Sequence, residues 1–567
     1  MDKQEAVQCL QIANELWAIE GANPYSVKAH ERAAEAILYA PLTINEILGL
    51  PPGTIHGVGR ETLAMLRALE KGGMAALLER LEISIPIRVA ELTRLPGIGP
   101  KTAHTLVHQH GIQSADDLST ALSEGRLGRI PGLGPSRLAR LRRDLCVFLD
   151  RNRFIPIASA WPFAMQLEHQ IRSIPGVQQV SVTGDVRRCV VMSPAIEWVV
   201  CTEDADRVLE WVRQFGYKPK SSASGIVAMA VPGQENRVPL RLYLTGQSNF
   251  ASVLMGTTGD DTHQGVIKGL LQDKGIEWRT GGLLRQDGST VSVAAERDIY
   301  ALVGLPFLPP EIREGQGVLC PPAELVTRSD LRGDLHVHST WSDGSLSIRE
   351  IVYRAEALGY EYIAITDHSQ SLTIAGGLTP ERLQAQKAAI EAVQQQTRVK
   401  ILHGIEVDIL PDGRLDLPDE TLFDLDLVIA SVHSAMHQTR EQMTRRIIRA
   451  IEHPAVHIIG HLTGRILGRR AAYELDTDLM VQEAHRHGVM LELNANPNRL
   501  DISEELLRQA KAAGMLVPVS TDAHHIGEFD YMEYGIRMAQ RGWLHKDEVL
   551  NTLPQDQLQV ILQKRRE

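Results

Sequence analysis

The residues best suited to chemistry are histidines and acids that follow short apolar segments in the last third of the chain. Fourteen of the 21 histidines lie after residue 333. Imidazole nitrogens and carboxylate oxygens are common ligands of zinc, manganese and iron ions. The candidate metal-binding and catalytic residues are His336, His338, Asp343, His368, Glu406, His433, His461, Asp522 and His524.

This set is too large for one ion. A single zinc takes about three or four protein ligands, so six imidazoles and three carboxylates predict two or three divalent ions, Mn2+ or Zn2+ or else Fe2+. Three such ions would outweigh three carboxylates, and the excess positive charge would hold a phosphodiester. The ions would also lower the pKa of a water that attacks phosphorus. The alternative, packed or surface histidines, suits one isolated histidine better than this whole set.

The candidate ligands need elements that bring them together. Seven short apolar segments alternate with amphipathic helical patterns after Gly333, which predicts a seven-stranded, distorted parallel (β/α) barrel. Six of the segments end in a candidate ligand, and strand ends of such barrels converge on one face. The segments are DLHVH, YIAIT, KILHGIE, LDLVIASV, HIIGHL, VMLELNA and VPVST.

This region resembles the PHP (polymerase and histidinol phosphatase) family from about Gly333 to Phe529. The similar segments are GDLHVHSTWSDG, AITDHS, HGIEVD, ASVHS, GHL, LELNANPNRLD and STDAHH. The resemblance implies an active phosphoesterase site with three metals. One would be held by His336, His338, Glu406 and Asp522. Glu406 would bridge to a second, held by His433 and His461, and a third would lie between Asp343, His368 and His524. Arg499 is a candidate phosphate contact, or else a solvated arginine.

Three segments in the first part of the chain share another motif. IHGVGRETLAML, LPGIGPKTAHTL and IPGLGPSRLARL each combine an apolar residue, a Gly-x-Gly turn and a helix. Glycines let the backbone approach a ligand, and a helix N-terminus presents free N–H groups to an anion. The segments resemble helix-hairpin-helix motifs, which grip DNA phosphates without sequence preference; a common Gly-rich helical turn is the alternative. The candidate DNA-binding residues are Gly57, Gly59, Gly97, Gly99, Lys101, Gly132, Gly134 and Arg137.

The order of these regions is informative. Helical modules, a mixed α/β segment and a PHP domain together resemble the bacterial X-family DNA polymerases over essentially the whole chain. TGDVRR and DIYALVGLPFLPPEIREG are similar to that family's palm motif and to the end of its thumb. The expected regions are helical domains at 1–85 and 86–155, a palm at 156–245, a thumb at 246–315, a linker at 316–332 and the barrel at 333–567.

The palm departs from the family pattern where nucleotidyl transfer needs carboxylates. The resemblance places Ala195 and Glu197 at an Asp-x-Asp pair, and Arg241 at the third acid. Two Mg2+ ions require an anionic cluster, so we expect an inactive polymerase site. Thr258-Gly259-Asp260 also replaces a TGS turn, and Arg187 and Arg188 remain candidate phosphate contacts. The alternative is a different register, in which Asp185, Glu203 or Asp204 serves instead.

Composition, charge and cysteine usage narrow the classes of protein to which this chain could belong. No apolar run reaches the about 18 residues of a membrane span, and the N-terminus does not resemble a signal peptide. The five cysteines lack CxxC spacing, which suits a reducing compartment, and we expect a cytoplasmic monomer. The net charge of −11 argues weakly against nucleic-acid binding, but eight arginines lie between Gly125 and Arg153.

The sequence therefore predicts a DNA-repair nuclease acting on 3′ ends and on gapped, nicked or abasic duplexes. The family resemblance implies 3′–5′ exonuclease activity, with abasic-site cleavage and 3′-end cleaning as candidates in base excision repair. Two alternatives stay open: an active DNA polymerase with a proofreading PHP domain, and a small-molecule phosphatase acting on a histidinol-phosphate-like substrate.

Overall fold

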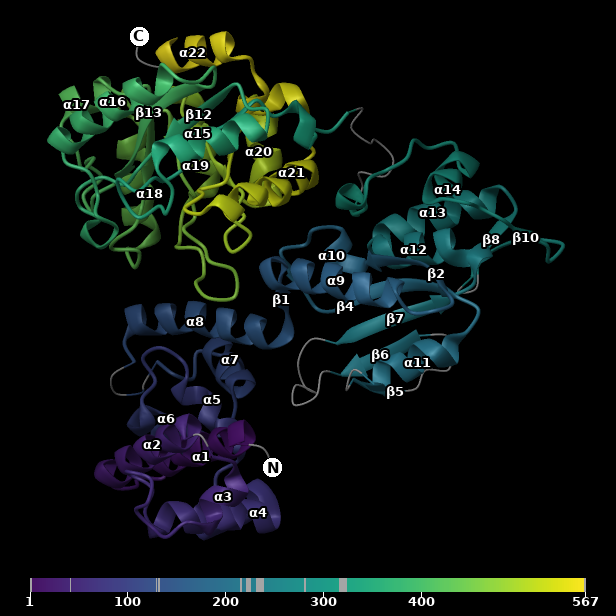
Figure 1. Ribbon diagram of the computed structural model, residues 1–567, viewed down its shortest axis with the longest axis vertical. Helices are drawn as coiled ribbons and strands as arrows, with labels where there is room; N and C mark the ends of the chain where they lie inside the picture. Colours follow the sequence, from purple (N-terminus) through teal and green to yellow (C-terminus); the bar gives the residue numbers. More distant parts are fainter. Residues whose placement is uncertain are drawn as a thin grey trace. The chain divides into compact units, whose positions relative to one another are not determined.

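The computed structural model describes residues 3–40, 42–128, 130, 133–214, 217–220, 226–230, 239–279, 282–315 and 324–564. The chain divides into two compact units, Met1–Asp150 and Arg151–Glu567. Figure 1 shows the first as helices alone and the second as helices combined with sheets. Within the described ranges, no helix is long and apolar enough to cross a bilayer.

The first unit is a set of helices around one apolar core. Leu16 and Ile37 contribute to this core, and so do Leu92, Leu106 and Leu145. Segments on both sides of residue 85 thus share a core, so the two expected helical regions pack as one body. The helices are α1 (Lys3–Ile19), α2 (Pro24–Tyr39), α3 (Ile44–Gly49), α4 (Arg60–Arg80), α5 (Ala90–Thr93), α6 (Pro100–His110), α7 (Ala115–Ser123) and α8 (Pro135–Arg153).

The second unit begins with a five-stranded sheet of order β2-β4-β7-β6-β5. β4 pairs antiparallel with β2 and parallel with β7, and its buried Trp198 donates to the carbonyl of Ala164 on α9 at 3.0 Å. Figure 1 labels these strands. The elements are β1 (Ile155–Pro156), α9 (Ile157–Arg172), β2 (Val177–Thr183), α10 (Gly184–Arg187), β3 (Met192–Ser193), β4 (Ile196–Thr202), α11 (Ala205–Gln214), β5 (Lys218–Lys220), β6 (Ile226–Ala230) and β7 (Leu240–Thr245).

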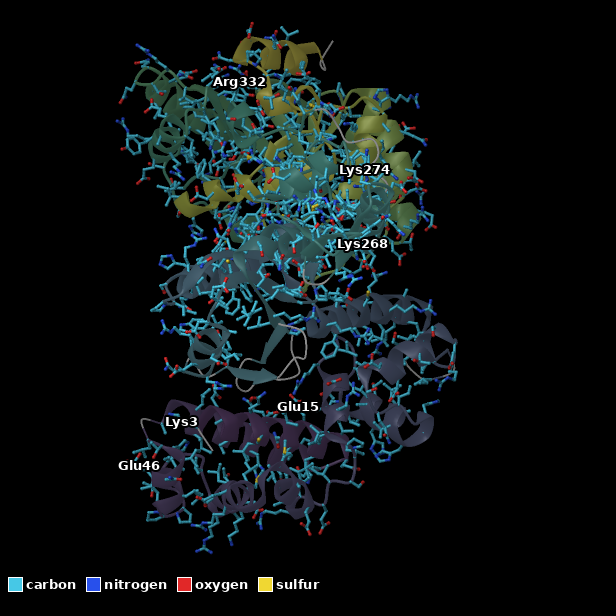
Figure 2. All side chains as sticks on the ribbon, turned by 90° about the vertical axis from the view of Figure 1, so that its right-hand side faces the viewer. Lys3, Glu15, Glu46, Lys268, Lys274 and Arg332 are labelled. Carbon is cyan, nitrogen blue, oxygen red and sulfur yellow. The ribbon has the colours of Figure 1, made fainter. Side chains whose placement is uncertain are left out.

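A smaller layer of helices and a three-stranded antiparallel sheet follows. Met255, Ile267 and Tyr300 lie in its core. Figure 2 labels Lys268 and Lys274, which lie exposed on and beside helix α13. The elements are α12 (Phe250–Thr258), α13 (Asp261–Asp273), β8 (Ile276–Arg279), β9 (Gly282–Arg285), β10 (Thr290–Val291) and α14 (Glu296–Leu302).

The C-terminal part is a curled parallel sheet in which β11 to β16 pair in sequence order. A parallel bridge between Val337 and Ala523 joins the first segment to the last and brings the sheet toward closure. The expected barrel is confirmed, with one difference in strand count: the sixth predicted strand is interrupted at Glu492. The strands are β11 (Gly333–Asp334), β12 (Tyr362–Ile365), β13 (Lys400–Asp408), β14 (Leu427–Ser431), β15 (Ile458–Ile459), β16 (Met490–Leu491), β17 (Leu493–Asn494) and β18 (Val519–Ser520).

Helices cover this sheet and begin at defined caps. Ser347, Thr379, Thr439 and Ser503 each accept a backbone N–H in the first turn of the helix that follows, which fixes where the chain turns after a strand. Leu558 and Leu562 of the last helix pack against Tyr362. The helices are α15 (Ile348–Ala357), α16 (Pro380–Gln394), α17 (Asp419–Phe423), α18 (Arg440–Ile451), α19 (Thr477–His487), α20 (Glu504–Ala512), α21 (Met532–Arg541) and α22 (Gln555–Lys564).

Buried arginines of α21 join the barrel to the preceding part of the second unit. Arg537 donates to Glu311 at 2.8 Å and lies over the ring of Trp161. Arg541 pairs with Glu314 at 3.0 Å and with Glu504 at 2.8 Å. These two buried guanidinium groups stay charged because each has a carboxylate partner.

Candidate metal centre and nucleic-acid interface

The nine predicted ligands come together at the carboxyl ends of the barrel strands. His336 and His338 follow β11, His368 follows β12, and Glu406 lies on β13. The others follow the later strands: His433 after β14, His461 after β15, and Asp522 with His524 after β18. Parallel strands thus deliver to one end of the sheet residues that lie far apart in sequence.

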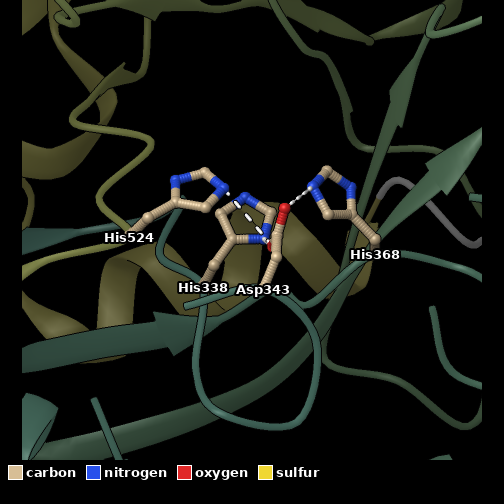
Figure 3. A group of neighbouring side chains, drawn as sticks. All are labelled: His338, Asp343, His368 and His524. Carbon is tan, nitrogen blue, oxygen red and sulfur yellow. Dashed lines mark ion pairs between the residues drawn. The ribbon is translucent and has the colours of Figure 1, made fainter. Parts of the chain in front are cut away.

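Asp343 lies between two histidines at the edge of the centre (Figure 3). Its carboxylate oxygens are 3.5 Å from His368 Nε2 and 3.4 Å from His524 Nε2. With His338, these residues offer ligand atoms that all lie within 4.8 Å of one another. This spacing accommodates one divalent ion.

Glu406 occupies the middle of the centre and is almost fully buried. One of its oxygens is 2.9 Å from His461 Nε2 and 3.4 Å from His433 Nε2. The other is 2.8 Å from His368 Nδ1 and 3.5 Å from His336 Nε2. A carboxylate with histidines on both oxygens has the geometry of a bridging ligand.

Asp522 completes the inner part of the centre. Its Oδ1 lies 3.1 Å from His338 Nε2 and 3.6 Å from His336 Nε2. The three residues form a second group that could hold an ion, and His368, Glu406 and His433 form a third. The groups share His338 and His368, so the sites are contiguous.

A layer of residues that sequence reasoning missed orients these ligands. His336 Nδ1 donates to Glu492 at 2.7 Å, and His433 Nδ1 donates to Asp408 at 2.6 Å. Each contact leaves Nε2 directed at the centre, the arrangement that tunes metal-bound histidines. In the sequence, both acids stand in or at the end of an otherwise apolar strand. Asp408 ends β13, and Glu492 interrupts the sixth strand.

The electrostatics show that the centre attracts positive charge. Burial lowers the pKa of His368, but the carboxylates of Glu406 and Asp343 outweigh it and raise this pKa to about 10. Burial also opposes ionisation of Glu406, yet the surrounding histidines hold its pKa well below the ordinary value. Protons and divalent cations therefore compete for the same buried carboxylates.

Several buried ligand atoms of the metal centre have no hydrogen-bond partner, which suits the binding of divalent ions better than the binding of protons. Among the described residues, His336 Nε2, both ring nitrogens of His338 and Glu406 Oε2 are buried without a hydrogen-bond partner. Buried polar atoms are normally satisfied, so an inward-facing group of such atoms indicates an ion-binding site. The donor set of imidazoles and carboxylates suits Mn, Zn or Fe.

Arg499 lies beside this centre. Its Nε is 3.7 Å from Asp522 Oδ2, and its buried Nη1 has no hydrogen-bond partner within the described part of the chain. The placement is compatible with a phosphate contact.

The three positions expected for polymerase carboxylates also lie together. Glu197 and Arg241 are register partners on β4 and β7, and Arg241 Nη1 donates to Glu197 at 2.8 Å. Tyr243 donates to the same oxygen at 2.9 Å, and the Glu197 charge helps to raise the tyrosine pKa after burial. Ala195 is buried just before β4. The cluster thus contains an internal ion pair.

The neighbouring motif residues have structural partners. Arg187 makes a double contact with Glu296 at 2.7 and 2.9 Å, and Arg188 contacts Glu314 at 3.1 Å. Asp260 caps α13 by accepting from the backbone N–H of His263 at 2.7 Å. The altered TGD turn therefore has a local role as a helix cap.

The glycine motifs form turns that lead directly into helices. Gly57 and Gly97 have φ of +86° and +87°, a region that residues with a β-carbon rarely adopt. Gly59 and Gly99 are the N-caps of α4 and α6. In the third motif Gly134 directly precedes α8, whereas Gly132 lies outside the described residues.

Two basic residues accompany these turns. Lys101 is exposed in the first turn of α6, and Arg137 donates to the carbonyl of Gly97 at 2.5 Å. Helix N-termini with exposed N–H groups and nearby cations suit the phosphate backbone.

Family comparisons agree with this architecture. The PHP domain model matches residues 334–532, a SAM-like helix-hairpin-helix tandem matches 89–145, and the DNA polymerase beta thumb matches 253–314. Fold and site together define an enzyme with a metal-dependent phosphoesterase domain joined to DNA-binding, polymerase-like modules. The chain is 32% identical over 570 residues, 100% of both chains, to DNA polymerase/3'-5' exonuclease PolX of Bacillus subtilis (strain 168). It belongs to the X-family DNA polymerases with a C-terminal PHP domain, as the motifs predicted.

Other relatives match the barrel. A probable phosphatase of Thermoanaerobacter sp. (strain X514) is 30% identical over 235 residues, which cover 39% of this chain and 89% of the relative. A 5'-3' exoribonuclease of Haemophilus influenzae is 38% identical over 81 residues, or 14% of this chain and 25% of the relative.

Proposed function

We propose that this protein is a nuclease that processes DNA ends in base excision repair. The barrel hydrolyses phosphodiesters, and the helix-hairpin-helix and thumb modules hold the DNA. The observation that carries this proposal is the convergence of nine candidate ligands, eight in the three ion-binding groups and His461 beside Glu406, in a chain that also has those modules. The name of the full-length relative includes a 3'-5' exonuclease, and we propose the same polarity here. Abasic-site cleavage and cleaning of 3′ ends are the candidate repair steps.

The residues of the centre divide the work. Divalent ions, with Mn2+ the first to test, supply Lewis acidity and a water of lowered pKa. His336, His338, Glu406 and Asp522 would hold ions in the inner part, with Glu406 as a bridge to His433 and His461, and Asp343, His368 and His524 would hold an ion at the outer edge. Glu492 and Asp408 keep two imidazoles in the tautomer that faces the centre. Arg499 orients the phosphate.

We also propose that the palm no longer transfers nucleotides. Support comes from Arg241, whose pKa is raised by its hydrogen bond to Glu197, so it remains charged. The permanently charged Arg241 guanidinium is paired with Glu197, the one acid among the three expected positions, and this charge opposes the binding of two Mg2+ ions. Arg187 and Arg188 then act mainly as internal ties, and the palm positions DNA for the barrel.

The decisive experiment incubates Mn2+-loaded protein with DNA labelled at either end. We expect stepwise shortening from the 3′ end on single-stranded, nicked and gapped substrates, and incision at abasic sites. Release of phosphate from small monoesters, with intact DNA left over, would overturn the proposal. The second candidate, a small-molecule phosphatase, is favoured by the barrel's likeness to probable phosphatases, in one of which the match covers 89% of the relative but 39% of this chain.

A further inference from the structure

Asp367 is a fully buried aspartate that directly precedes the candidate ligand His368. Its two carboxylate oxygens accept five hydrogen bonds. Oδ1 accepts from the backbone N–H groups of Ser339 and Ser342 at 2.8 and 3.1 Å, and from the Ser342 hydroxyl at 2.5 Å. Oδ2 accepts from the Ser339 hydroxyl and from Gln386 Nε2, both at 2.6 Å. A buried carboxylate surrounded by donors in this way holds them in one arrangement.

Four of these five bonds come from one loop, residues 339–344, which lies between the ligand His338 and helix α15. We call it the Asp343 loop, after the ligand it carries. The backbone N–H of Gly344 donates to the carbonyl of Ser339 at 3.0 Å and closes the loop. A β-carbon on Gly344 would overlap the carbonyl oxygen of His338, so the loop packs directly on the backbone of another ligand.

Helix α16 supports the Asp343 loop through two side chains. Arg382 and Gln386 are four residues apart and therefore lie on one face of this helix. Gln386 donates to Asp367, and Arg382 Nη2 donates to the carbonyl of Trp341 in the loop at 2.5 Å. The helix, Asp367 and the loop thus form one hydrogen-bond network that leads to Asp343.

This network reaches the outer group of the metal centre, which consists of His338, Asp343, His368 and His524 (Figure 3). Two of these side chains are the most exposed of the nine candidate ligands. Asp343 is 35% exposed and His524 is 27% exposed, whereas Glu406 is 1% exposed. Packing constrains an exposed side chain less than a buried one, so the position of Asp343 depends on how firmly its loop is held.

We propose that Asp367 is a positioning residue for the outer divalent ion, because it holds Asp343 where that carboxylate can bind an ion together with His368 and His524. The inference rests on the proposed metal centre and is independent of the DNA substrate. Partners that orient metal ligands commonly change metal affinity about 10- to 100-fold. Without Asp367 the loop still carries Asp343, but the loop must be ordered when the ion binds, and this cost weakens the outer ion alone.

The test measures the number of Mn2+ ions bound by the full chain and the Kd of each, by titration followed with electron paramagnetic resonance. Asp367→Ala removes all five contacts, so one ion should bind about 10- to 100-fold more weakly while the others keep their affinity. The matched comparison is Asp334→Ala. Asp334 is also fully buried, but it accepts from Thr521 Oγ1 at 2.6 Å, beside the inner ligand Asp522, so its loss should weaken an inner ion instead.

A double-mutant cycle with Asp343→Ala shows which ion is affected. Asp343→Ala should abolish binding of the outer ion, and adding Asp367→Ala should then change no remaining Kd, because both substitutions act on the same ion. Adding Asp334→Ala to Asp343→Ala should weaken a further ion. A barrel that is merely destabilised by loss of Asp367 would lose affinity for the inner ions as well, with or without Asp343.

The outcomes separate this role from the metal centre itself. If wild-type protein binds two or more ions and Asp367→Ala keeps every Kd within about twofold, the inference is overturned and the metal centre stands. Weaker inner ions in the double variant also overturn it. If wild-type protein binds fewer than two ions, the metal centre fails and the inference fails with it. Should Asp367→Ala not fold, Ser342→Ala decides: it removes only the 2.5 Å hydroxyl contact and should weaken the outer ion about tenfold.

Discussion

At the scale of single residues, Glu406 is the side chain on which the metal centre depends most. Both of its oxygens face histidines, and the residue is only 1% exposed. Removing it leaves several inward-facing imidazoles without the negative charge that balances them. Its loss should affect more than one ion, whereas loss of an outer histidine should affect one.

Glu406→Ala should bind at least one divalent ion fewer per chain and lose about a hundredfold or more of nuclease activity. Elemental analysis after reloading with Mn2+, together with hydrolysis rates, measures both effects. Glu420→Ala on α17 is the matched control, because Glu420 is exposed. Unchanged metal content in Glu406→Ala would contradict the assignment of this residue as a bridge.

Glu492 acts one layer further out, through His336. Glu492→Gln keeps the shape of the side chain but removes the charge that accepts the Nδ1 proton, so Mn2+ affinity should fall about 10- to 100-fold. Metal titration followed by electron paramagnetic resonance reads this out without any assay of activity. An affinity equal to wild type would mean that the 2.7 Å contact does not tune the ligand.

The sequence predicted nine candidate ligands that the structure places together, because most of them follow an apolar strand and strand ends of a parallel barrel meet. It did not predict the roles of Glu492 and Asp408, because an acid within or at the end of an apolar strand does not show by its spacing which ligand it orients. Their role depends on side-chain direction, which only packing determines.

At the scale of elements, the glycine turns set where the N-terminal helices begin. Gly97 turns the chain so that Gly99 can cap α6. A β-carbon at Gly97 would strain the turn and would approach Arg137 Nε at 3.7 Å. A substitution that alters the turn at Gly97 should therefore also shift the N-terminus of α6.

Gly97→Ala should weaken binding to every DNA sequence by a similar factor, about tenfold, because phosphates rather than bases are contacted. Fluorescence anisotropy on several duplexes at fixed salt measures this. Gly111→Ala is the control: Gly111 also has positive φ, +66°, but it ends α6 rather than starting it. A sequence-dependent loss, or equal losses in both variants, would count against phosphate recognition by this turn.

Helix α13 carries a histidine that makes stability depend on pH. Burial, helped by the nearby Arg313 charge, lowers the pKa of His263 to about 4. In the unfolded chain the pKa of this histidine is about 6.5, so the unfolded state binds a proton that the folded state does not bind. The free energy of unfolding therefore decreases as the pH falls from about 7 to 4. The full effect is on the order of 3 kcal/mol.

His263→Asn cannot titrate and should lose this part of the pH dependence. Hydrogen exchange of α13, measured between pH 7 and pH 4, should show wild-type protein weakening relative to the variant as pH falls. A constant difference between the two proteins would contradict the assignment.

At the scale of the whole molecule, the sequence predicted the order of the modules along the chain. It did not predict how the helical region before residue 155 is divided into packed bodies. Separate motifs predicted two helical regions before residue 155, yet α1 to α8 share one core because apolar faces on both sides of residue 85 pack together. Motif spacing locates function along the chain but does not reveal which apolar faces meet.

The full chain should not extend a primer, although it belongs to a polymerase family. Gap filling with Mg2+ or Mn2+ and all four nucleotides should stay at background while nuclease activity persists, because Arg241 neutralises Glu197, the one acid at the three positions expected to hold Mg2+. Extension that survives in Glu406→Ala would show that other acids, such as Asp185, complete the polymerase site.

The arginines of α21 have a consequence for how such a gene can change. Arg537 and Arg541 are buried against Glu311 and Glu314, which belong to the polymerase-like half. Deleting that half would remove both of these carboxylate partners, and of the two arginines Arg541 would keep its 2.8 Å contact with Glu504 of the barrel. If this chain no longer synthesises DNA, we therefore expect its polymerase-like half to be retained, because the barrel shares these buried ion pairs with it.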